Sequence, residues 1–508
     1  MRGIDIKTIA ALLRAGNPAA PAIGAPDRTT MTRAELVQLV DRTGGALRAR
    51  GIRQDHAVAM VMPNGPEVAA AFVAVASWAI AAPLNAAYRA EEFDFYLGDL
   101  DAKALIIEGG ADSPVRAVAA RRNIPIIELT PDETGPAGSF TLSIPFADAG
   151  LARPDPNDVA LVLHTSGTTS RPKIVPLRHR NLAVSARNTA ATLALTAQDR
   201  CLVIMPLFHI HGLVGTLLSS LSADGSVYCT PNFHTLKFYG WLDHSQATWY
   251  SAAPTLHQMI LARADRNAEV IARNRLRLIR SSSAAMPPQV IKQLEDTFGC
   301  PVIEAYGMTE ASHQMASNPL PPRARRPGTV GIAAGPDIAI MGPGGALLPH
   351  GETGEIVIRG ENVTAGYANN PKANDEAFVN GWFRTGDQGV FDVEDGYLRI
   401  TGRLKEIINR GGEKVAPREV DDVLMDHPAV AQVVTFAMPH ALLGEEVAAA
   451  VVLCEGAAAT EQELRAFAAP HLADFKIPRK IVFLSEIPKG PTGKLQRIGL
   501  AQRLGLTG

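Results

Sequence analysis

Short apolar runs alternate with amphipathic helical patterns over roughly the first 305 residues of the chain. Residues 30–50 predict a helix, because their apolar side chains recur at helical spacing on one side, and residues 56–62 predict a buried strand. An alternation of strands and helices is typical of α/β domains with a parallel or mixed sheet. Further helices are predicted at 66–80, 90–100, 178–195, 213–221, 235–246 and 288–298, and further strands at 104–108, 159–163, 200–204, 226–230, 248–252 and 302–305.

The pattern changes after about residue 328, where short runs are separated by glycine-rich turns that indicate β-structure. It changes again after Arg403. Residues 407–415 predict a hairpin with a Gly-Gly turn, and a helix at 417–425 and strands at 430–436 and 446–454 follow. The last hundred residues are therefore expected to form a compact α+β domain, with a boundary near 402–406.

The length of 508 residues favours two or more domains, and a hydrophobic content of 46% with 20% charged residues indicates a globular protein. A net charge of −2 argues against general nucleic-acid or anionic-membrane binding, so neither partner is expected. The four cysteines lack metal-ligand spacing, and we found no signal peptide, membrane span or peroxisomal address. These features predict a cytoplasmic protein with reduced thiols.

One polar stretch between apolar segments has the composition of a phosphate-binding loop. Thr165 to Ser170 are all small hydroxyl or glycine residues, and Lys173 follows within reach of the same point. Such a loop can aim backbone N–H groups and hydroxyls at phosphate oxygens. It lies between the predicted strand 159–163 and a helix expected from about Arg178, although it lacks the G-x-x-x-x-G-K-[ST] pattern. A solvated Ser/Thr/Gly linker is the alternative interpretation.

Two histidines, His209 and His211, stand two residues apart before Gly212. A strand end with two hydrogen-bonded imidazoles explains them as well as a functional site does. A zinc site is not expected, because no cysteine or acidic residue stands nearby.

Five short motifs occur in a fixed order, and together they carry a resemblance that none carries alone. They are T-S-G-T-T-S-R-P-K at 165–173, Y-G-M-T-E at 306–310, W-F-R-T-G-D at 382–387, G-R-L-K-E-I-I-N-R-G-G-E-K at 402–414 and P-K-G-P-T-G-K at 488–494. The chain resembles the acyl-adenylate-forming superfamily of acyl-CoA synthetases, luciferases and peptide-synthetase adenylation domains from about residue 30 to 500. The resemblance implies ATP, Mg²⁺ and coenzyme A as cofactors and a small carboxylic acid as substrate.

For the fold, the resemblance implies a mixed α/β (α+β) architecture. The large N-terminal domain, 1–402, would hold stacked βαβ-type sheets, a small β-barrel-like part, and the ATP and acid sites. Residues 403–407 would form a hinge, and residues 408–508 a small mobile α+β lid. A monomer and a dimer remain equally open.

For the nucleotide, the resemblance assigns the phosphates to the loop and to Lys173. Glu310, with Thr165, would hold Mg²⁺, and Thr309 stands beside it. Asp387 and Arg403 would bind the ribose or phosphate. The remaining nucleotide residues on the loop and around the adenine would be Ser166, Gly167, Thr168, Thr169, Ser283, Ala284, Glu304, Ala305, Tyr306, Gly307 and Met308.

For catalysis, the resemblance places most weight on Lys494, which would bridge the acid and the α-phosphate when the lid closes. Lys405 would be the pivot of the lid, and His209 a gate beside the acid pocket. The thiol step would use the hairpin of the lid, whose candidate coenzyme A contacts are Arg410, Gly411, Gly412 and Lys414.

The acid pocket is expected to be short and polar. Ser281-Ser282-Ser283-Ala284 stands where many fatty- and aryl-acid members carry a Gly-Gly-Ala turn, and Arg280 precedes it. A small acid with a second anionic end suits such a pocket, because a buried carboxylate must be paired. Longer stretches such as F-H-I-H-G at 208–212 resemble the oxalate–CoA ligase branch. Candidate substrate residues are His209, His211, His234, Ser282, Ser283 and His313.

Several alternatives remain at this point. The acid could be malonate, acetate or a longer acid instead of oxalate. A peptide-synthetase adenylation domain would normally show an aspartate near 209 and a carrier domain downstream, and a luciferase would need a pocket for a large aromatic substrate. A binding protein that keeps the fold without catalysis is the alternative from another class, which the intact motifs disfavour.

Overall fold

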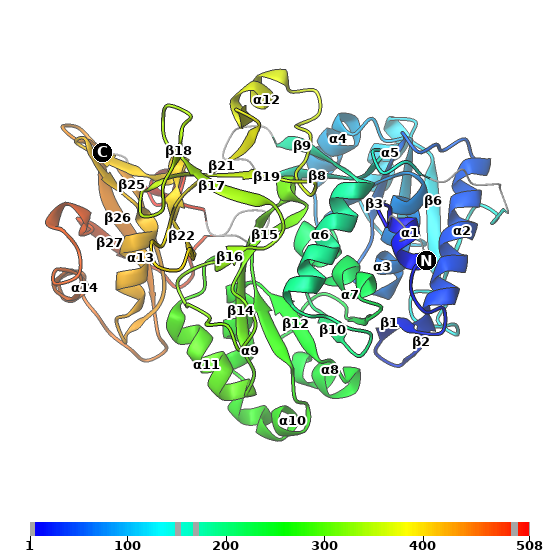
Figure 1. Cartoon of the computed structure of the whole chain (residues 1–508), viewed down its shortest axis with the longest axis horizontal. Coiled ribbons are helices and arrows are strands. Elements are labelled where there is room, and N and C mark those ends of the chain that lie inside the picture. The colour runs from blue at the N-terminus through cyan, green and yellow to red at the C-terminus, as the bar shows by residue number, and fades with distance from the viewer. Residues whose placement is uncertain (1–5, 148–153, 166–171, 489–495, 507–508) are drawn as a thin grey trace. The chain divides into compact units, whose positions relative to one another are not determined.

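The computed structural model describes residues 6–147, 154–165, 172–488 and 496–506. The chain divides into two compact units. The first consists of residues 1–165, 173–338 and 358–378, and the second of 166–172, 339–357 and 379–508. Figure 1 shows the elements of both units along the chain. The predicted boundary at 403–407 lies inside the second unit, and its role as a hinge stays a prediction.

The first unit contains a nine-stranded sheet whose central strands are parallel. These central strands are buried apart from Arg200, which explains why they show no alternation of exposed polar and buried apolar positions. In spatial order the strands are β16 (Ile332–Ala333), β15 (His313–Ser317), β14 (Val302–Met308), β13 (Leu278–Ser281), β12 (Trp249–Ala252), β10 (Arg200–Val203), β11 (Ser226–Cys229), β1 (Pro21–Ala25) and β2 (Arg28–Thr32).

A seven-stranded sheet forms the other layer of strands in this unit. In spatial order its strands are β7 (Phe140–Leu142), β6 (Ile126–Pro131), β5 (Ala104–Glu108), β3 (Ala57–Val61), β4 (Ile80–Leu84), β8 (Val159–Thr165) and β9 (Lys173–Arg178). The edge strand β9 runs antiparallel to β8, so the predicted phosphate loop connects two strands of a hairpin. The helix expected from about Arg178 is present as α6 (His179–Thr192), and β9, which was not predicted, lies between the loop and this helix.

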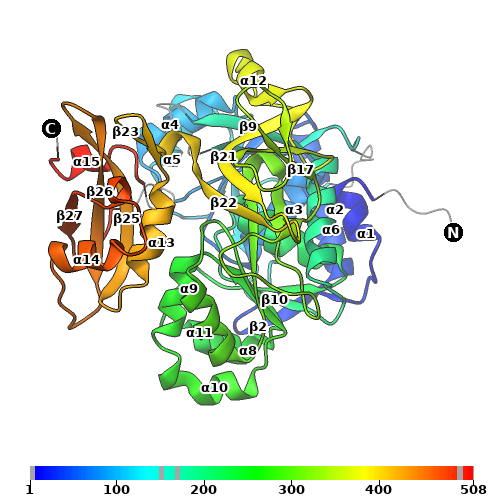
Figure 2. The same cartoon turned by 60° about the vertical axis from the view of Figure 1, so that its left-hand side comes forward.

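Helices cover the sheets of the first unit, and Figures 1 and 2 both show α8, α9, α10 and α11 grouped together beside the nine-stranded sheet. Apolar side chains of α8 and α11 pack on those strands in one continuous core. The helices are α1 (Ile9–Arg14), α2 (Arg33–Ala49), α3 (Pro66–Trp78), α4 (Ala90–Asp99), α5 (Val115–Arg121), α6 (His179–Thr192), α7 (Ser219–Ser222), α8 (Phe238–Ser245), α9 (Pro254–Leu261), α10 (Ala268–Arg273), α11 (Pro288–Phe298) and α12 (Pro371–Ala377), with the short 3₁₀ turns η2 (Asp265–Asn267) and η3 (Thr309–Ala311).

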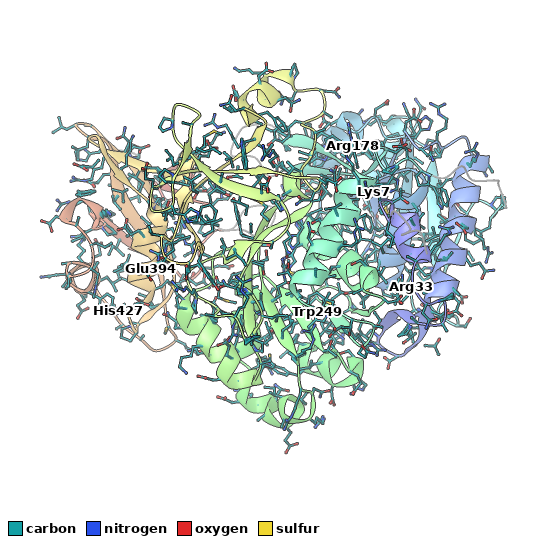
Figure 3. The ribbon with its side chains drawn as sticks, viewed as in Figure 1. Lys7, Arg33, Arg178, Trp249, Glu394 and His427 are labelled. Atoms are coloured by element: carbon teal, nitrogen blue, oxygen red, sulfur yellow. The ribbon has the colours of Figure 1, made fainter. Side chains whose placement is uncertain are left out.

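Two features at helix starts organise this unit. Helix α2 begins with a capping box between Thr32 and Glu35, and its first residue, Arg33, is buried. The Arg33 guanidinium donates to the carbonyl of Leu221 and pairs with Asp224, which ties α2 to the region of α7 (Figure 3). The predicted helix at 213–221 begins instead as a π-helix, η1 (His211–Leu218), which continues into α7.

The second unit contains most of a six-stranded sheet, made of β18 (Leu347–Leu348), β17 (Asp337–Met341), β19 (Gly354–Arg359), β21 (Trp382–Phe391), β20 (Phe378–Val379) and β22 (Leu398–Arg403). It also contains a five-stranded sheet with its own apolar cores. The elements of this α+β part are η4 (Leu404–Glu406), β23 (Ile408–Arg410), β24 (Glu413–Val415), α13 (Pro417–Met425), β25 (Val430–His440), β26 (Gly444–Leu453), α14 (Glu461–Ala468), η5 (Asp474–Lys476), β27 (Lys480–Phe483) and α15 (Leu500–Arg503).

The mixed α/β fold class predicted from the sequence is confirmed, including the change to β-structure after residue 328 and the final α+β part. The Gly-Gly hairpin is also present, since Arg410 pairs with Glu413 across Gly411 and Gly412. All four cysteines are free thiols, and three of them are buried. Within the described part of the chain, no helix combines the length and the apolar character that crossing a bilayer requires.

Candidate active site

The flanks of the predicted phosphate loop lie opposite each other in the β8–β9 hairpin. Thr165 at the end of β8 is in register with Lys173 at the start of β9. The loop's Ser166, Gly167, Thr168 and Thr169 lie outside the described residues. The hairpin thus brings together the two ends of the loop, with a hydroxyl on one side and an ammonium on the other.

One tyrosine, Tyr367, contacts both the Lys173 side chain and the predicted metal ligand Glu310. The Lys173 ammonium nitrogen is 4.3 Å from the centre of the Tyr367 ring, and the Tyr367 hydroxyl donates to Glu310 Oε1 at 2.9 Å. Glu310 is 6% exposed and Tyr367 8% exposed. Burial and the neighbouring Glu310 carboxylate raise the pKa of Tyr367. The phenol therefore stays protonated and acts as a donor to the carboxylate.

Glu310 owes its place to the β14–β15 hairpin. Thr309 and Glu310 form the 3₁₀ turn after β14, and His313 begins β15. Gly307 allows the two strands to approach, because an added Cβ at this position would lie 1.6 Å from the carbonyl oxygen of His313. The predicted metal ligand and a predicted acid-pocket histidine thus belong to one tight turn.

The predicted acid pocket contains a chain of buried hydrogen bonds centred on His211, the first residue of the π-helix. The two ring nitrogens of His211 lie 2.9 Å from Ser283 Oγ and 2.6 Å from Ser251 Oγ. Ser283 has φ +78°, a conformation that favours glycine, and its hydroxyl is held at the end of the turn after β13. Ser251 lies on the buried strand β12, two residues after Trp249, which is labelled in Figure 3.

The same chain continues to Arg280, a residue at the end of β13 with no exposed surface. Its guanidinium donates to Ser251 Oγ at 3.4 Å and to Gln314 Oε1 at 3.2 Å. Among the described residues Arg280 has no carboxylate partner. Burial lowers the pKa of Arg280 to about 10, which still leaves it charged at neutral pH. The site therefore holds a buried positive charge without a protein anion.

His313 completes this cluster. Its ring stacks on that of His211 with centroids 5.1 Å apart, and its Nε2 is buried and has no hydrogen-bond partner among the described residues. Burial, helped by Arg280 and His211, places the pKa of His313 well below its ordinary value, so the ring is neutral. The π-helix makes room for the ring at Gly215, where an added Cβ would lie 2.4 Å from His313 Nε2.

Other predicted residues lie around this cluster with less direct contact. Ser282 Oγ donates to the carbonyl of Ala305 at 3.0 Å, and Glu304 Oε1 accepts from the amide of Met286 at 3.4 Å. His209 is half-buried, and its ring contacts Phe208. The predicted residues Ala284, Tyr306 and Met308 are exposed, buried and half-buried, respectively.

His234 stands apart from the other predicted substrate residues. It is exposed in the turn before α8, and its Nδ1 accepts from the amide of Leu236 at 3.2 Å. None of the contacts recorded for the described residues joins it to the cluster around His211. Its role in acid binding stays a prediction.

In the second unit, the predicted ribose residues are joined to each other. Asp387 on β21 is in register with Arg403 on β22, and Asp387 Oδ1 accepts from Arg403 Nε at 2.8 Å. Asp387 is 6% exposed, so its carboxylate is desolvated and held in a fixed position. The Thr385 hydroxyl supports the turn by accepting from the Asp387 amide at 3.1 Å.

The predicted coenzyme A hairpin is also ordered by its neighbours. Arg410 pairs with Glu446 at 2.6 Å, and the Gly411 amide donates to the carbonyl of Leu443 at 2.9 Å. Gly411 and Gly412 have φ +59° and +102°, which explains why glycine stands at both positions. Lys414 is exposed.

Of the predicted pivot Lys405 and the predicted catalytic residue Lys494, only Lys405 belongs to the described residues. Lys405 is exposed in η4, beside Glu406, which pairs with Arg497 at 3.2 Å. Arg497 also pairs with the buried Asp421 at 2.6 Å. Lys494, three residues before Arg497 in the sequence, lies outside the described residues.

The residues present fit a magnesium ion that is held mainly by its nucleotide. No group of three or more His, Cys, Asp or Glu side chains suited to a metal ion occurs in the ranges that the structure describes. Mg²⁺ is usually bound by one or two carboxylates together with substrate phosphates. The buried Glu310 carboxylate, which is connected to Lys173 through Tyr367, is a ligand of this kind.

The sequence interpretation did not select three residues that the structure places at these sites. Ser251 and Gln314 contact Arg280, and Tyr367 contacts Lys173 and Glu310. Arg280 was noted only as a neighbour of the serine turn. The sequence could not show that Arg280 lacks a carboxylate partner, because an acidic residue from any distant segment could have paired with it.

Several named proteins are similar in sequence to this chain over most of its length. It is 44% identical over 491 residues to the oxalate–CoA ligase of Arabidopsis thaliana, with 95% of each chain covered. It is 44% identical to the oxalate–CoA ligase of Saccharomyces cerevisiae, with 89% of this chain and 87% of the relative covered. It is 35% identical to the sulfoacetate–CoA ligase of Cupriavidus necator, with 97% of both chains covered.

A solved structure with the same fold is ATP-bound MatB from Rhodopseudomonas palustris, which is 30% identical, has a TM-score of 0.87 and is covered over 98% of both chains. The sequence pattern of the AMP-binding enzyme matches residues 13–368, and that of the AMP-binding enzyme C-terminal domain matches residues 419–494. The chain therefore belongs to the AMP-binding enzyme family.

Proposed function

We propose that the protein is an AMP-forming carboxylate–CoA ligase whose substrate is a small dianionic acid, with oxalate as the first candidate. Two relatives at 44% identity are oxalate–CoA ligases, and a third relative is named for sulfoacetate, another short acid with two anionic ends. ATP and coenzyme A are the co-substrates. The four free thiols support the predicted cytoplasmic location.

The observation that carries the choice of acid is the buried charge of Arg280, which has no carboxylate partner in the part of the chain that the structure describes. A buried cation without an anion is strongly destabilising, so a site that keeps one is suited to an anionic ligand. Around it stand the imidazoles of His211 and His313 and the hydroxyls of Ser251 and Ser283. These groups can hydrogen-bond the far carboxylate of a two-carbon diacid. A fatty acid offers them no partner.

The chemistry has two steps. In the first, a carboxylate oxygen of the acid attacks the α-phosphorus of ATP, an acyl–AMP bond forms, and pyrophosphate leaves. In the second, the thiolate of coenzyme A attacks the acyl carbonyl, the thioester forms, and AMP leaves. The first transition state spreads negative charge over phosphoryl oxygens and needs fixed cations and N–H donors.

In this proposal the 165–169 loop and Lys173 hold the β- and γ-phosphates, and Glu310 with Thr165 holds Mg²⁺. When bound, Mg²⁺ supplies charge neutralisation at the phosphates. Asp387 accepts hydrogen bonds from the ribose hydroxyls, and Arg403 orients the Asp387 carboxylate through their ion pair. Thr309 and His209 border the reacting groups, and His234, Ser282 and His313 belong to the acid site.

The C-terminal part supplies the remaining groups. Lys494 would bridge the acid and the α-phosphate in the first step, and rotation about Lys405 would then present Arg410, Gly411, Gly412 and Lys414 to coenzyme A. The division into 1–402, a hinge at 403–407 and a lid at 408–508 is part of this proposal. A monomer or a dimer is compatible with it.

The test is a panel of acids assayed for AMP formation with coenzyme A present. The panel contains oxalate, sulfoacetate, malonate, acetate and a long-chain fatty acid. We expect the highest kcat/KM with oxalate and appreciable turnover only with short dianionic acids. A preference for acetate or for the fatty acid would overturn the choice of substrate, and absence of pyrophosphate release with every acid would indicate a protein that only binds nucleotide.

The variant Arg280→Met makes the test specific to the charge. Methionine keeps much of the arginine volume but removes the cation, so we expect kcat/KM for oxalate to fall by about 10²- to 10³-fold. The value for acetate should change far less, because acetate has no second carboxylate. Equal losses for both acids would show that Arg280 acts only on the structure of the site.

A further inference from the structure

The segment at 360–368 is bound to both elements that carry the predicted ATP-binding groups. The Thr364 amide donates to the carbonyl of Glu310 at 2.7 Å, and its hydroxyl donates to the carbonyl of Pro176 at 2.8 Å. The Ala368 amide donates to the carbonyl of Ile174 at 3.1 Å. The segment thus fixes η3 against β9, and Tyr367 lies between its two attachment points.

We propose that Tyr367 is a positioning residue that sets the spacing between the Glu310 carboxylate and the Lys173 ammonium, so that magnesium-bound ATP meets both groups already in place. The inference rests on the proposed function, since it assumes that these two groups bind metal and phosphate. Tyr367 itself belongs neither to the predicted metal-binding residues nor to the predicted phosphate-binding residues.

The geometry of the tyrosine supports this role. Its hydroxyl reaches Glu310 Oε1 at 2.9 Å, while its ring face lies 4.3 Å from the Lys173 ammonium nitrogen. One side chain therefore makes a hydrogen bond to the anion and a cation–π contact to the cation. Because Tyr367 is 8% exposed, its ring is packed and cannot easily change its position.

The chemistry of the two contacts is also suitable. Neither contact neutralises the charge it holds, since the phenol is neutral. A carboxylate that accepts a hydrogen bond from a phenol remains an anionic oxygen ligand for a metal ion, and an ammonium over a ring face remains able to donate N–H groups to phosphate oxygens. Preorganised charges of this kind need no reorganisation when the nucleotide arrives.

The experiment separates the two contacts with two variants. Tyr367→Phe keeps the ring under Lys173 and removes the hydroxyl, whereas Tyr367→Leu removes both contacts. The first readout is the affinity for ATP with and without Mg²⁺, measured by calorimetry without acid or coenzyme A. The second is the Mg²⁺ concentration that half-saturates pyrophosphate release.

For Tyr367→Phe, we expect the half-saturating Mg²⁺ concentration to rise about tenfold, with the affinity for metal-free ATP within about twofold of wild type. For Tyr367→Leu, we expect the affinity for metal-free ATP to fall as well, by about threefold to tenfold. The KM for the acid should stay within about twofold in both variants, because the two contacts that these variants remove go to Glu310 and Lys173 and not to residues assigned to the acid.

Tyr239→Phe is the matched control. Tyr239 is also buried, and its hydroxyl donates to the carbonyl of Ile260 at 2.8 Å, away from the nucleotide residues. This control should lose a similar amount of thermal stability to Tyr367→Phe without any change in Mg²⁺ dependence. A further check is the double variant Tyr367→Phe/Glu310→Gln, in which the hydroxyl should no longer affect Mg²⁺ dependence.

The inference is overturned if Tyr367→Phe shows wild-type Mg²⁺ dependence, or if it changes the constants for ATP, Mg²⁺ and acid equally. The latter result would assign Tyr367 a purely structural role. Failure of the proposed function is distinguishable, because wild-type protein would then release no pyrophosphate with any acid, while the calorimetric comparison of nucleotide affinities could still be made.

Discussion

Ser283 illustrates how one residue can combine backbone strain with a specific contact. Its φ of +78° belongs to the region that glycine adopts most readily, and a serine there is strained. Its hydroxyl lies 2.9 Å from His211 Nδ1. This contact holds the imidazole in one orientation, as binding of the acid in the proposed site would require. Strain at such a position is typical of residues kept for function.

The variant Ser283→Gly should therefore raise the KM for oxalate by about tenfold, because His211 loses one of its two hydroxyl partners. The KM for ATP should remain within about twofold of its original value, and the melting temperature should not fall, since glycine relieves the strain. His313→Ala should show the same selectivity for the acid. If the KM for ATP rises instead, the residues have been assigned to the wrong substrate.

Single site residues could be identified from the sequence more readily than the residues that they contact. Asp387, Arg403 and Glu310 could be selected from short motifs, because each motif carries its own spacing. The contacts of Arg280 with Gln314, and of Tyr367 with Glu310, join positions that are 34 and 57 residues apart. Contacts of this kind are set by the packing of distant segments, and no local pattern reveals them.

Among the secondary-structure elements, the β14–β15 hairpin has the greatest effect on the candidate site, because Glu310 and His313 both belong to its turn region. The closeness of its strands depends on Gly307, whose added Cβ would meet a backbone carbonyl instead of a flexible side chain. Backbone cannot move aside locally, so any side chain here must separate the strands.

Gly307→Ala should consequently lower the free energy of unfolding by about 3 kcal/mol and weaken both Mg²⁺-ATP and acid binding. The matched control is Gly240→Ala in α8, where an added Cβ meets nothing within 4 Å. That control should be neutral or stabilising by about 0.5–1 kcal/mol, as alanine favours a helix. Chemical denaturation of both variants decides the matter, and equal effects would contradict the close-approach argument.

The longer helices and most of the buried parallel strands could be predicted from their apolar patterns, whereas short and edge strands such as β1, β2, β6 and β7 were not predicted. For some of the missed features there is a physical reason. Strand β9 was missed because Pro176 argues against a strand, yet β9 is an edge strand, where proline is tolerated. The π-helix from His211 to Leu218 has the same apolar pattern as an α-helix, so periodicity alone could not distinguish them. The short strand β15 begins two residues after the turn at Thr309–Ala311, so the sequence pattern did not distinguish the strand from the turn.

Helix α6 begins at a buried histidine, His179, whose Nδ1 accepts from the Ile9 amide at 3.4 Å. Burial lowers the pKa of His179 to about 4, against the opposing effect of Asp155. In the unfolded chain the imidazole binds its proton at its ordinary pKa of about 6.5. The unfolded state therefore takes up a proton first as the pH falls, and the folded state loses stability.

We expect His179 to contribute about 3 kcal/mol that is fully present above pH 6.5 and lost as the pH falls toward 4. Comparing wild type with His179→Asn by thermal unfolding between pH 7.5 and 4.5 provides the measurement. Asparagine keeps an acceptor for the Ile9 amide but does not titrate in this range, so the variant should show a flatter pH dependence. Parallel curves for the two proteins would rule out this histidine as the cause.

For the whole molecule, the important feature is that the C-terminal part is internally complete. The cores of its five-stranded sheet are built from residues between 408 and 506. An ion cluster joins Arg497 to Asp421 and to Glu406, the neighbour of the predicted pivot. Arg497 thus connects the segment that follows Lys494 with the segment that contains Lys405. A part organised in this way could rotate as one body.

Lys494→Ala tests whether this part contributes to only one of the two steps. Pyrophosphate release should fall by about 10²- to 10³-fold, since a cation is lost where charge develops. Thioester formation from supplied acyl-adenylate should remain within a few fold, because in the proposed mechanism the thiol step uses the other face of the lid. Equal losses in both half-reactions would contradict the division of labour between the two faces.

The lone guanidinium of Arg280 also bears on how long the protein survives in a cell. A dianionic acid that neutralises it binds the native chain and not the denatured one, so supply of the acid shifts the population away from protease-sensitive forms. At a hundred times its Kd, the acid would add about 2.7 kcal/mol of protection. Degradation should thus be fastest when the acid is scarce, and the abundance of the protein would follow the availability of its own substrate without any dedicated regulator.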